Sequence, residues 1–466
     1  MQIIGREQEI FELGRLMDSG RPEFVAVYGR RRVGKTFLIR EYFKGSFAFY
    51  ATGMARGNYK DQLTHFYETL VDYGLPKQQS TPKDWRENFR LLQTLIEKKR
   101  GEGRKVIFLD EVPWMDTQKS NFIQALDLFW NTWASARTDI VLIVCGSAAG
   151  WMVKNIVRNT GGLHNRLTCQ MRIQPFTLKE VNEFLRSHGI LWSAQTVAEC
   201  YMIMGGIPYY LQYLDKSMSL AQNIDRLFFR ENALLQDEYT NLFRSLFKHS
   251  EEYVKIVEAL ARKRCGLTRN EIIECCKITN GGGLTRRLEE LEQCGFIRPY
   301  STIGNANTHY QLVDFYTLFY HTFLTKAHAY DDNAWMYMQS GSRYNTWLGL
   351  SFERLCFAHL REVRQALSIG GVATKTFALR TESAQIDMLI ERADKTITVC
   401  EIKWSGMTEY TLSKAETSKI LERLDVARLK YPRRNVMLCM ITSAGIKRNE
   451  YVTQYVNNVI SLEDFF

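Results

Sequence analysis

Short apolar runs alternate with polar turns and amphipathic segments through the first third of the chain. The runs at 24–29, 106–109 and 140–145 have the length of buried strands rather than of helices. FLIREYF at 37–43 has helical periodicity and follows the first run after a short loop. Strands that alternate with helices in this way predict a parallel sheet that binds its ligand at the carboxyl ends of its strands.

The middle of the chain changes to a pattern of consecutive helices. Thr268 is a good N-cap, and Glu271 three residues later completes a capping box. The apolar spacing predicts three helices followed by two strands that pair across a turn-rich loop at 304–307. The helices are expected at about 253–263, 268–276 and 281–294, and the strands at 296–302 and 309–313.

This order of elements predicts a winged helix-turn-helix. Its third helix would carry Thr285, Arg286 and Arg287 toward a DNA major groove. The segment is only mildly basic, so a structural adaptor that packs against the ligand-binding parallel-sheet part of the chain is an equally open interpretation.

Three acidic positions lie in apolar surroundings near the end of the chain. Glu353 is the one acid in an apolar-rich helix predicted at 348–360, and Asp387 lies inside a strand predicted at 385–390. The next strand, TITVCEIKW at 396–404, carries Glu401 and Lys403 on one face because side chains alternate along a strand. Two carboxylates and a lysine brought together by such a hairpin predict a magnesium site that acts on a phosphodiester.

Composition and charge narrow the class of protein. The chain has 466 residues, of which 45% are hydrophobic and 24% charged, so it is expected to be globular with roughly three domains. We expect a cytoplasmic protein without a membrane span or secretory signal, whose ten cysteines are reduced. The net charge of +10 favours a polyanionic partner such as DNA.

The loop after the first strand matches the phosphate-binding pattern G-x-x-x-x-G-K-[ST] between a strand and a helix. Gly29 and Gly34 let the backbone curl around a phosphate, Lys35 would contact the β- and γ-phosphates, and Thr36 would bind Mg²⁺. The segment expected to contact ATP consists of Gly29, Arg30, Arg31, Arg32, Val33, Gly34, Lys35, Thr36 and Phe37.

Polar side chains also follow the other two predicted strands. Asp110 is expected in the magnesium shell, and Glu111 is the expected catalytic base for the attacking water. Ser147 follows the third strand, where it would either sense the γ-phosphate or simply cap the next helix.

The segments IIGREQEI, GRRRVGKT, FLDE, CGS and GGIPYYL resemble the archaeal-type ATPases of the AAA+/STAND group over about the first 240 residues. The resemblance implies a sheet domain followed by a helical lid, with Pro208 of GGIPYYL near the nucleotide. It also implies that Ile4, Gly5 and Arg6 contact the adenine side. Arg166 is the nearest match to an arginine finger, and Arg158 competes with it.

The C-terminal acids resemble the PD-(D/E)xK nuclease superfamily over roughly residues 340–445. This resemblance implies metal binding by Glu353, Asp387 and Glu401, and catalysis by Asp387, Glu401 and Lys403. Many archaeal-type ATPases end in such a domain, so the two resemblances support each other.

Together these features predict a multidomain α/β protein. The expected parts are a parallel-sheet P-loop ATPase core, a helical lid, a winged helix-turn-helix and a C-terminal α/β restriction-endonuclease-like domain, at 1–175, 176–245, 246–325 and 326–466. The expected function is Mg²⁺-dependent ATP hydrolysis on DNA, and a homo-oligomer would supply the arginine finger. The alternative is a nucleotide-dependent signalling or scaffold ATPase whose nuclease-like domain is inactive.

Overall fold

The structure is a computed structural model that describes residues 2–99, 101, 103–247, 249–263, 265–301, 308–326, 333–380 and 385–466. Contacts divide the chain into two compact units, Met1–Pro175 and Phe176–Phe466, called here the N-terminal and the C-terminal unit. The finer division of the C-terminal unit into three domains stays a prediction.

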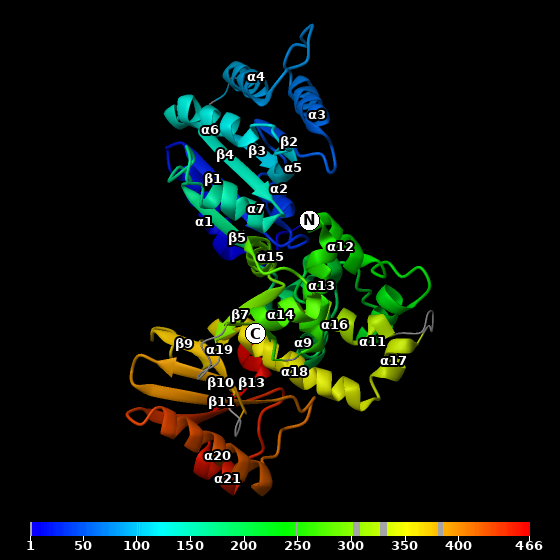
Figure 1. Cartoon of the computed structure of the whole chain (residues 1–466), viewed down its shortest axis with the longest axis vertical. Coiled ribbons are helices and arrows are strands. Elements are labelled where there is room, and N and C mark those ends of the chain that lie inside the picture. The colour runs from blue at the N-terminus through cyan, green and yellow to red at the C-terminus, as the bar shows by residue number, and fades with distance from the viewer. Residues whose placement is uncertain are drawn as a thin grey trace. The chain divides into compact units, whose positions relative to one another are not determined.

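The N-terminal unit is built on a five-stranded sheet in which every pair of neighbouring strands is parallel. The predicted parallel sheet is therefore confirmed. The strands lie in the order β2-β3-β4-β1-β5 (Figure 1). Their bounds are β1 Glu23–Gly29, β2 Phe49–Thr52, β3 Lys105–Asp110, β4 Ile140–Gly146 and β5 Cys169–Ile173.

Helices cover this sheet because its central strands are apolar on both faces. All seven residues of β4 are buried, and so are five of the six residues of β3. Aromatic side chains of α3, α4 and α6, among them Phe66, Trp85 and Phe122, form one core cluster with Phe24 of β1. The helices are α1 Glu7–Asp18, α2 Lys35–Tyr42, α3 Tyr59–Asp72, α4 Trp85–Lys98, α5 Val112–Met115, α6 Phe122–Thr132 and α7 Ala149–Met152.

The strand order determines where the polar loops meet. Because β4 lies between β3 and β1, the carboxyl ends of these three strands are adjacent at one edge of the sheet. The loops that begin after Gly29, Asp110 and Gly146 therefore converge there.

The C-terminal unit begins with a helical part. Tyr210, Phe228, Tyr316, Phe319 and Trp335 form an aromatic core in which neighbouring rings contact one another. The helices of this part are α8 Leu178–Ser187, α9 Ala194–Met204, α10 Pro208–Leu211, α11 Leu220–Ile224, α12 Glu238–Leu246, α16 Phe315–Thr322 and α17 Ala334–Met338.

Three helices and a small sheet stand between α12 and α16. The predicted helices, the two hairpin strands and the capping box of Thr268 with Glu271 are confirmed, whereas the loop at 304–307 lies outside the described residues. A third strand of two residues, β6, was not predicted. The elements are α13 Ser250–Arg262, β6 Leu267–Thr268, α14 Arg269–Cys276, α15 Gly282–Gln293, β7 Ile297–Ser301 and β8 Thr308–Leu312, with the sheet order β6-β8-β7.

A second five-stranded sheet follows, in the order β13-β12-β11-β10-β9. It is antiparallel from β9 to β11 and parallel from β11 to β13. Ile420 and Leu424 of α20 pack on it. The elements are α18 Ser342–Ala358, α19 Leu360–Ala366, β9 Thr374–Arg380, β10 Gln385–Arg392, β11 Thr396–Lys403, α20 Lys414–Lys430, β12 Asn435–Thr442, α21 Glu450–Tyr455 and β13 Asn458–Ser461.

The helix predicted at 348–360 differs from the structure at both ends. It begins at Ser342 and ends at Ala358, and a second helix starts at Leu360. His359, at the break, is buried and accepts a hydrogen bond from the backbone N–H of Leu178 at 2.9 Å. The end of α18 thus coincides with a contact between two residues that are 181 positions apart in sequence.

All ten cysteines are free thiols. None of the described helices combines the length and the apolar character that crossing a bilayer requires.

Candidate functional site

Two glycines shape the loop after β1. Gly29 has a φ of +148°, and a Cβ built on it would lie 2.3 Å from the carbonyl oxygen of Ile173, so only glycine fits. Gly34 has a φ of +87° and is the N-cap of α2. The loop therefore leads directly into the N-terminus of α2, whose first N–H groups favour an anion.

Lys35 is 4% exposed at the start of α2. Its Nζ donates hydrogen bonds to the carbonyl oxygens of Gly29 at 3.2 Å and Arg30 at 2.9 Å, and to Oγ of Ser147 at 3.0 Å. The lysine of the loop is thus linked to the end of β4.

Thr36 and Asp110 meet at the same edge. Oγ1 of Thr36 donates to Oδ2 of Asp110 at 2.8 Å, and the backbone N–H of Glu111 donates to Oδ1 at 2.9 Å. Burial raises the pKa of Asp110, the charge of Glu111 adds to this, and the hydrogen bond from Thr36 opposes it. A hydroxyl and a carboxylate at this separation are oxygen ligands that suit Mg²⁺.

Glu111 has a φ of 47°, which is rare for a residue with a side chain. Its carboxylate accepts from Oγ of Ser147 at 2.5 Å and from the Ser147 backbone N–H at 3.1 Å. Ser147 therefore bridges Lys35 and Glu111. The alternative that Ser147 caps the following helix is wrong, since the N-cap of α7 is Ala148 and no side chain caps that helix.

The remaining N-terminal candidates lie around this network. Arg6 is 6% exposed and donates through Nη2 to the carbonyl oxygens of Val33 at 3.2 Å and Gln174 at 2.8 Å, so it ties the loop to the end of β5. Gly5, with a φ of 63°, leads into it. Arg30 is buried, Phe37 is exposed, and Ile4, Arg31 and Arg32 are half-buried.

The structure does not assign the arginine finger or the lid contact. Arg158 and Arg166 are both exposed after α7. Pro208 is the first residue of α10 in the C-terminal unit. All three roles stay predictions.

In the C-terminal sheet, Glu401 is 2% exposed and pairs with two cations. Its Oε1 lies 2.8 Å from Nζ of Lys403, and its Oε2 accepts from Nη1 of Arg423 on α20. Asp387 accepts from the backbone N–H of Ile402 at 3.1 Å. Burial raises the pKa of Asp387 to about 6, and the neighbouring charge of Glu401 contributes to this shift.

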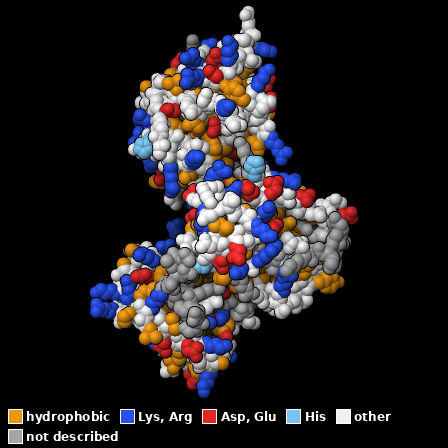
Figure 2. Space-filling model, viewed as in Figure 1, with side chains coloured by type: hydrophobic (Ala, Val, Ile, Leu, Met, Phe, Trp, Pro, Cys, Tyr) orange, Lys and Arg blue, Asp and Glu red, His pale blue; other side chains and the backbone are white. Residues whose placement is uncertain are grey.

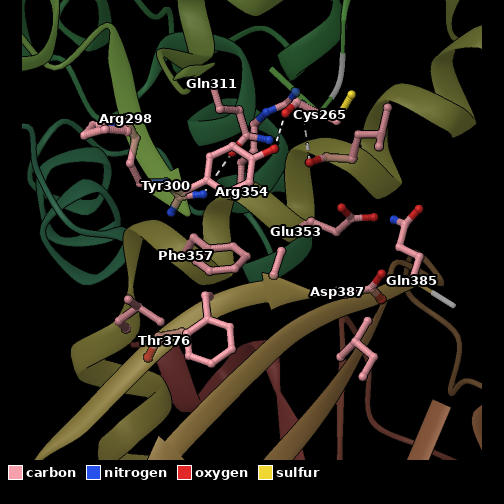
Figure 3. Close-up of a pocket in the computed structure, with 16 residues that line it drawn as sticks. Cys265, Arg298, Tyr300, Gln311, Glu353, Arg354, Phe357, Thr376, Gln385 and Asp387 are labelled. Carbon is pink, nitrogen blue, oxygen red and sulfur yellow. Dashed lines mark hydrogen bonds between the residues drawn. The ribbon is translucent and has the colours of Figure 1, made fainter. Parts of the chain in front are cut away.

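Glu353 reaches this region from α18. It lines the same cavity as Asp387, and Figure 3 shows both side chains at one end of that cavity beside Gln385. However, the described ranges contain no cluster of three or more His, Cys, Asp or Glu side chains arranged to hold a metal ion. The structure thus brings Asp387, Glu401 and Lys403 together. The three predicted metal ligands, Glu353, Asp387 and Glu401, do not form such a cluster.

Sequence reasoning missed Arg423 and the arginines of the cavity, Arg298 and Arg354. Arg423 lies within an ordinary charged helix, 22 residues from the glutamate that it contacts. No motif marks Arg423 or Arg298, because their partners lie on other elements.

Comparison with known proteins agrees with the N-terminal geometry. Residues 3–214 match the model of an ATPase domain found predominantly in Archaea. An uncharacterized protein of Methanocaldococcus jannaschii, MJECL04, is 24% identical over 419 residues, which cover 88% of this chain and 89% of that protein.

Solved structures give weaker similarities. The Walker-type ATPase paby2304 of Pyrococcus abyssi is 19% identical with a TM-score of 0.47, covering 68% of this chain and 95% of that one. The ORC2 protein of Aeropyrum pernix, in ADPNP and ADP complexes, is 13% identical with a TM-score of 0.44, covering 73% and 96%. Since both TM-scores are below 0.5, these two likenesses decide neither fold nor function. The match of residues 3–214 to that family and the parallel sheet with its phosphate loop support a P-loop ATPase fold for the N-terminal part of this chain.

Proposed function

We propose that this chain hydrolyses ATP with Mg²⁺ and couples the reaction to nucleic acid held by its C-terminal unit. The observation that carries the first part is one hydrogen-bonded network at the edge of the N-terminal sheet. Lys35, Ser147 and Glu111 are linked in one chain of contacts, and Thr36 and Asp110 form a second link beside it.

Each residue of the network has a distinct task in this proposal. Lys35 neutralises charge on the β- and γ-phosphates, and Thr36 with Asp110 holds Mg²⁺. The bound ion neutralises charge that develops on the phosphate oxygens. Glu111 accepts the proton of the attacking water, and Ser147 fixes the direction of its carboxylate.

Loss of the lysine tests this assignment. Lys35→Ala is expected to remove most ATP binding and hydrolysis, as measured by calorimetry and phosphate release. Lys44→Ala, at an exposed position after α2, is the matched control. Undiminished ATP binding by Lys35→Ala would refute the phosphate site.

The nucleic-acid part of the proposal rests on charge and on the C-terminal elements. The chain carries a net charge of +10. Lys and Arg side chains gather where β10 turns into β11 (Figure 2), and Lys375 and Lys395 are exposed in that region. In α15, Thr285 and Arg286 are exposed, whereas Arg287 pairs with Glu252 of α13. We assign α13–α15 with β6–β8 as the winged helix-turn-helix and the second sheet as the nuclease-like domain.

One observation favours the second candidate, a signalling or scaffold ATPase. Glu401 is already neutralised by Lys403 and Arg423, which leaves less negative charge for a cation. Mg²⁺-dependent plasmid nicking separates the two functions. Nicking that Glu401→Ala abolishes, and that the exposed control Glu409→Ala retains, supports a nuclease. No nicking by the wild-type chain supports the scaffold.

A further inference from the structure

A cavity of about 330 Å³ lies inside the C-terminal unit, within the size range of small-ligand sites. Its walls come mainly from five elements: the hairpin of β7 and β8, the helix α18, and the strands β9 and β10 (Figure 3). The cavity therefore joins the small three-stranded sheet to the sheet that carries Asp387.

Arg298 of β7 places a cation at this cavity. Its Nη2 donates to Oε1 of Gln311 at 2.9 Å, and its guanidinium carbon lies 4.3 Å from the centroid of the Phe357 ring. Its Nε is buried and makes no hydrogen bond with the described residues. Burial also lowers the pKa of Arg298. A half-buried cation whose contacts are neutral is costly unless an anion completes the site.

The rest of the lining supplies other kinds of contact. Tyr300, Phe357 and Phe377 add aromatic surface, on which a base can stack. Glu353 and Asp387 lie at one end, and Arg354 adds a second guanidinium. A cation and aromatic rings around one space match the chemistry of a nucleotide linked to a chain, with an anionic phosphate and a flat base.

We propose that this cavity takes one unstacked nucleotide of a nucleic-acid strand, with its phosphate at Arg298 and its base against the aromatic wall. The inference rests on the proposed nucleic-acid function and adds which form of nucleic acid the C-terminal unit binds. A base inside a duplex cannot enter a cavity of this size, so the cavity selects a single strand or a strand end. The bound nucleotide would bring the adjoining backbone toward Asp387.

The test uses the full chain and a short fluorescein-labelled oligothymidylate, followed by fluorescence anisotropy with EDTA and again with Ca²⁺. Arg298→Gln and Arg298→Met are compared with Arg448→Gln, which removes an exposed arginine. Both Arg298 variants should weaken strand binding by about tenfold or more. Arg448→Gln should change it by less than about twofold.

A stability measurement guards against misfolded variants. Arg298→Met should keep or raise the melting temperature, because it removes a half-buried charge that makes no ion pair with the described residues. Weaker strand binding together with unchanged or higher stability supports the inference. Equal strand binding by wild type and both Arg298 variants would show that the cavity is not the binding site. The proposed nucleic-acid function would not be contradicted by that result.

Two further arms identify the ligand. The first adds thymidine 5′-monophosphate as a competitor. If it displaces the labelled strand at concentrations similar to those at which the strand itself binds, the cavity holds a free nucleotide and the inference of a strand is wrong. If the wild-type chain binds no strand in either buffer, the nucleic-acid function and this inference both fail.

Discussion

Thr36 and Asp110 are 74 residues apart in sequence, and the hydroxyl of the first donates a 2.8 Å hydrogen bond to the carboxylate of the second. One belongs to the helix after β1 and the other ends β3, with β4 between these strands. The contact exists because parallel strands end at one edge of the sheet. It places the two expected ligands of Mg²⁺ side by side.

Removal of the Thr36 hydroxyl should therefore abolish most magnesium-dependent hydrolysis. Thr36→Val keeps the shape of the side chain but leaves buried Asp110 without its hydroxyl partner, and hydrolysis should fall by about 100-fold, a few kcal/mol of lost stabilisation. Thr36→Ser keeps the hydroxyl and should stay within a few-fold of wild type. Phosphate release at increasing Mg²⁺ concentration measures both variants. Equal rates for Thr36→Val and Thr36→Ser would contradict the assignment of Thr36 as a ligand of Mg²⁺.

Ser147 should affect the rate of hydrolysis more than ATP binding. Ser147→Ala removes the hydroxyl that contacts Glu111 and leaves the backbone N–H contact, so kcat should fall by about tenfold. ATP affinity should change only a few-fold. Ser120→Ala, which removes another buried serine of the same unit, should leave kcat unchanged. A large rise in KM with normal kcat would show that Ser147 acts on binding instead.

Gly29 should tolerate no side chain. In Gly29→Ala the new Cβ would lie 2.3 Å from the carbonyl oxygen of Ile173, so the N-terminal unit should lose about 3 kcal/mol or more of unfolding free energy. Gly14→Ala is the control: its Cβ meets only the hydroxyl of Tyr42 at 3.5 Å, within α1, and helix propensity should stabilise it by about 0.5–1 kcal/mol. Urea unfolding measures both. Equal stability of the two variants would contradict the close contact between β1 and β5.

His321 should make the stability of the C-terminal unit dependent on pH. Its Nε2 lies 3.0 Å from the hydroxyl of Tyr239, and burial, with a smaller effect of Arg262, lowers its pKa from 6.5 to about 4. Because the unfolded chain binds this proton more readily, the contribution is complete above pH 6.5 and is lost as the pH falls toward 4. At pH 5 the loss relative to pH 7 should be about 2 kcal/mol.

Denaturant unfolding at pH 7 and pH 5 measures this contribution. His321→Gln should show a smaller difference in unfolding free energy between the two pH values than wild type. His188→Gln, at an exposed position, should keep the wild-type difference. The same pH dependence in wild type and His321→Gln would exclude His321 as its source.

The features that could be predicted from the sequence are local. The strand–loop–helix around Lys35 and the capping box of Thr268 each lie within a few residues, so short-range spacing determines them. The acids at the end of β3, Asp110 and Glu111, were predicted because an apolar run ends directly before them. Glu401 and Lys403 were predicted to share a face because strand periodicity alone requires it.

Contacts between distant segments could not be predicted in this way. Nothing in the sequence gives the full order β2-β3-β4-β1-β5. Ser147 was expected between the other two strand ends, but its hydrogen bonds to Lys35 and Glu111 were not predicted. Arg423 and Arg298 act through partners on other elements, and the end of α18 coincides with the contact between His359 and Leu178. These positions follow from packing of the folded chain.

The central claim is that Glu111 is the base of an ATP-hydrolysing site. Its most direct test is steady-state phosphate release by the full chain, with Mg²⁺ and with EDTA, for wild type and Glu111→Gln, together with ATP affinity. The account predicts Mg²⁺-dependent hydrolysis by wild type, and a loss of about 100-fold or more in Glu111→Gln with ATP affinity within a few-fold of wild type. Hydrolysis by Glu111→Gln at the wild-type rate would contradict it.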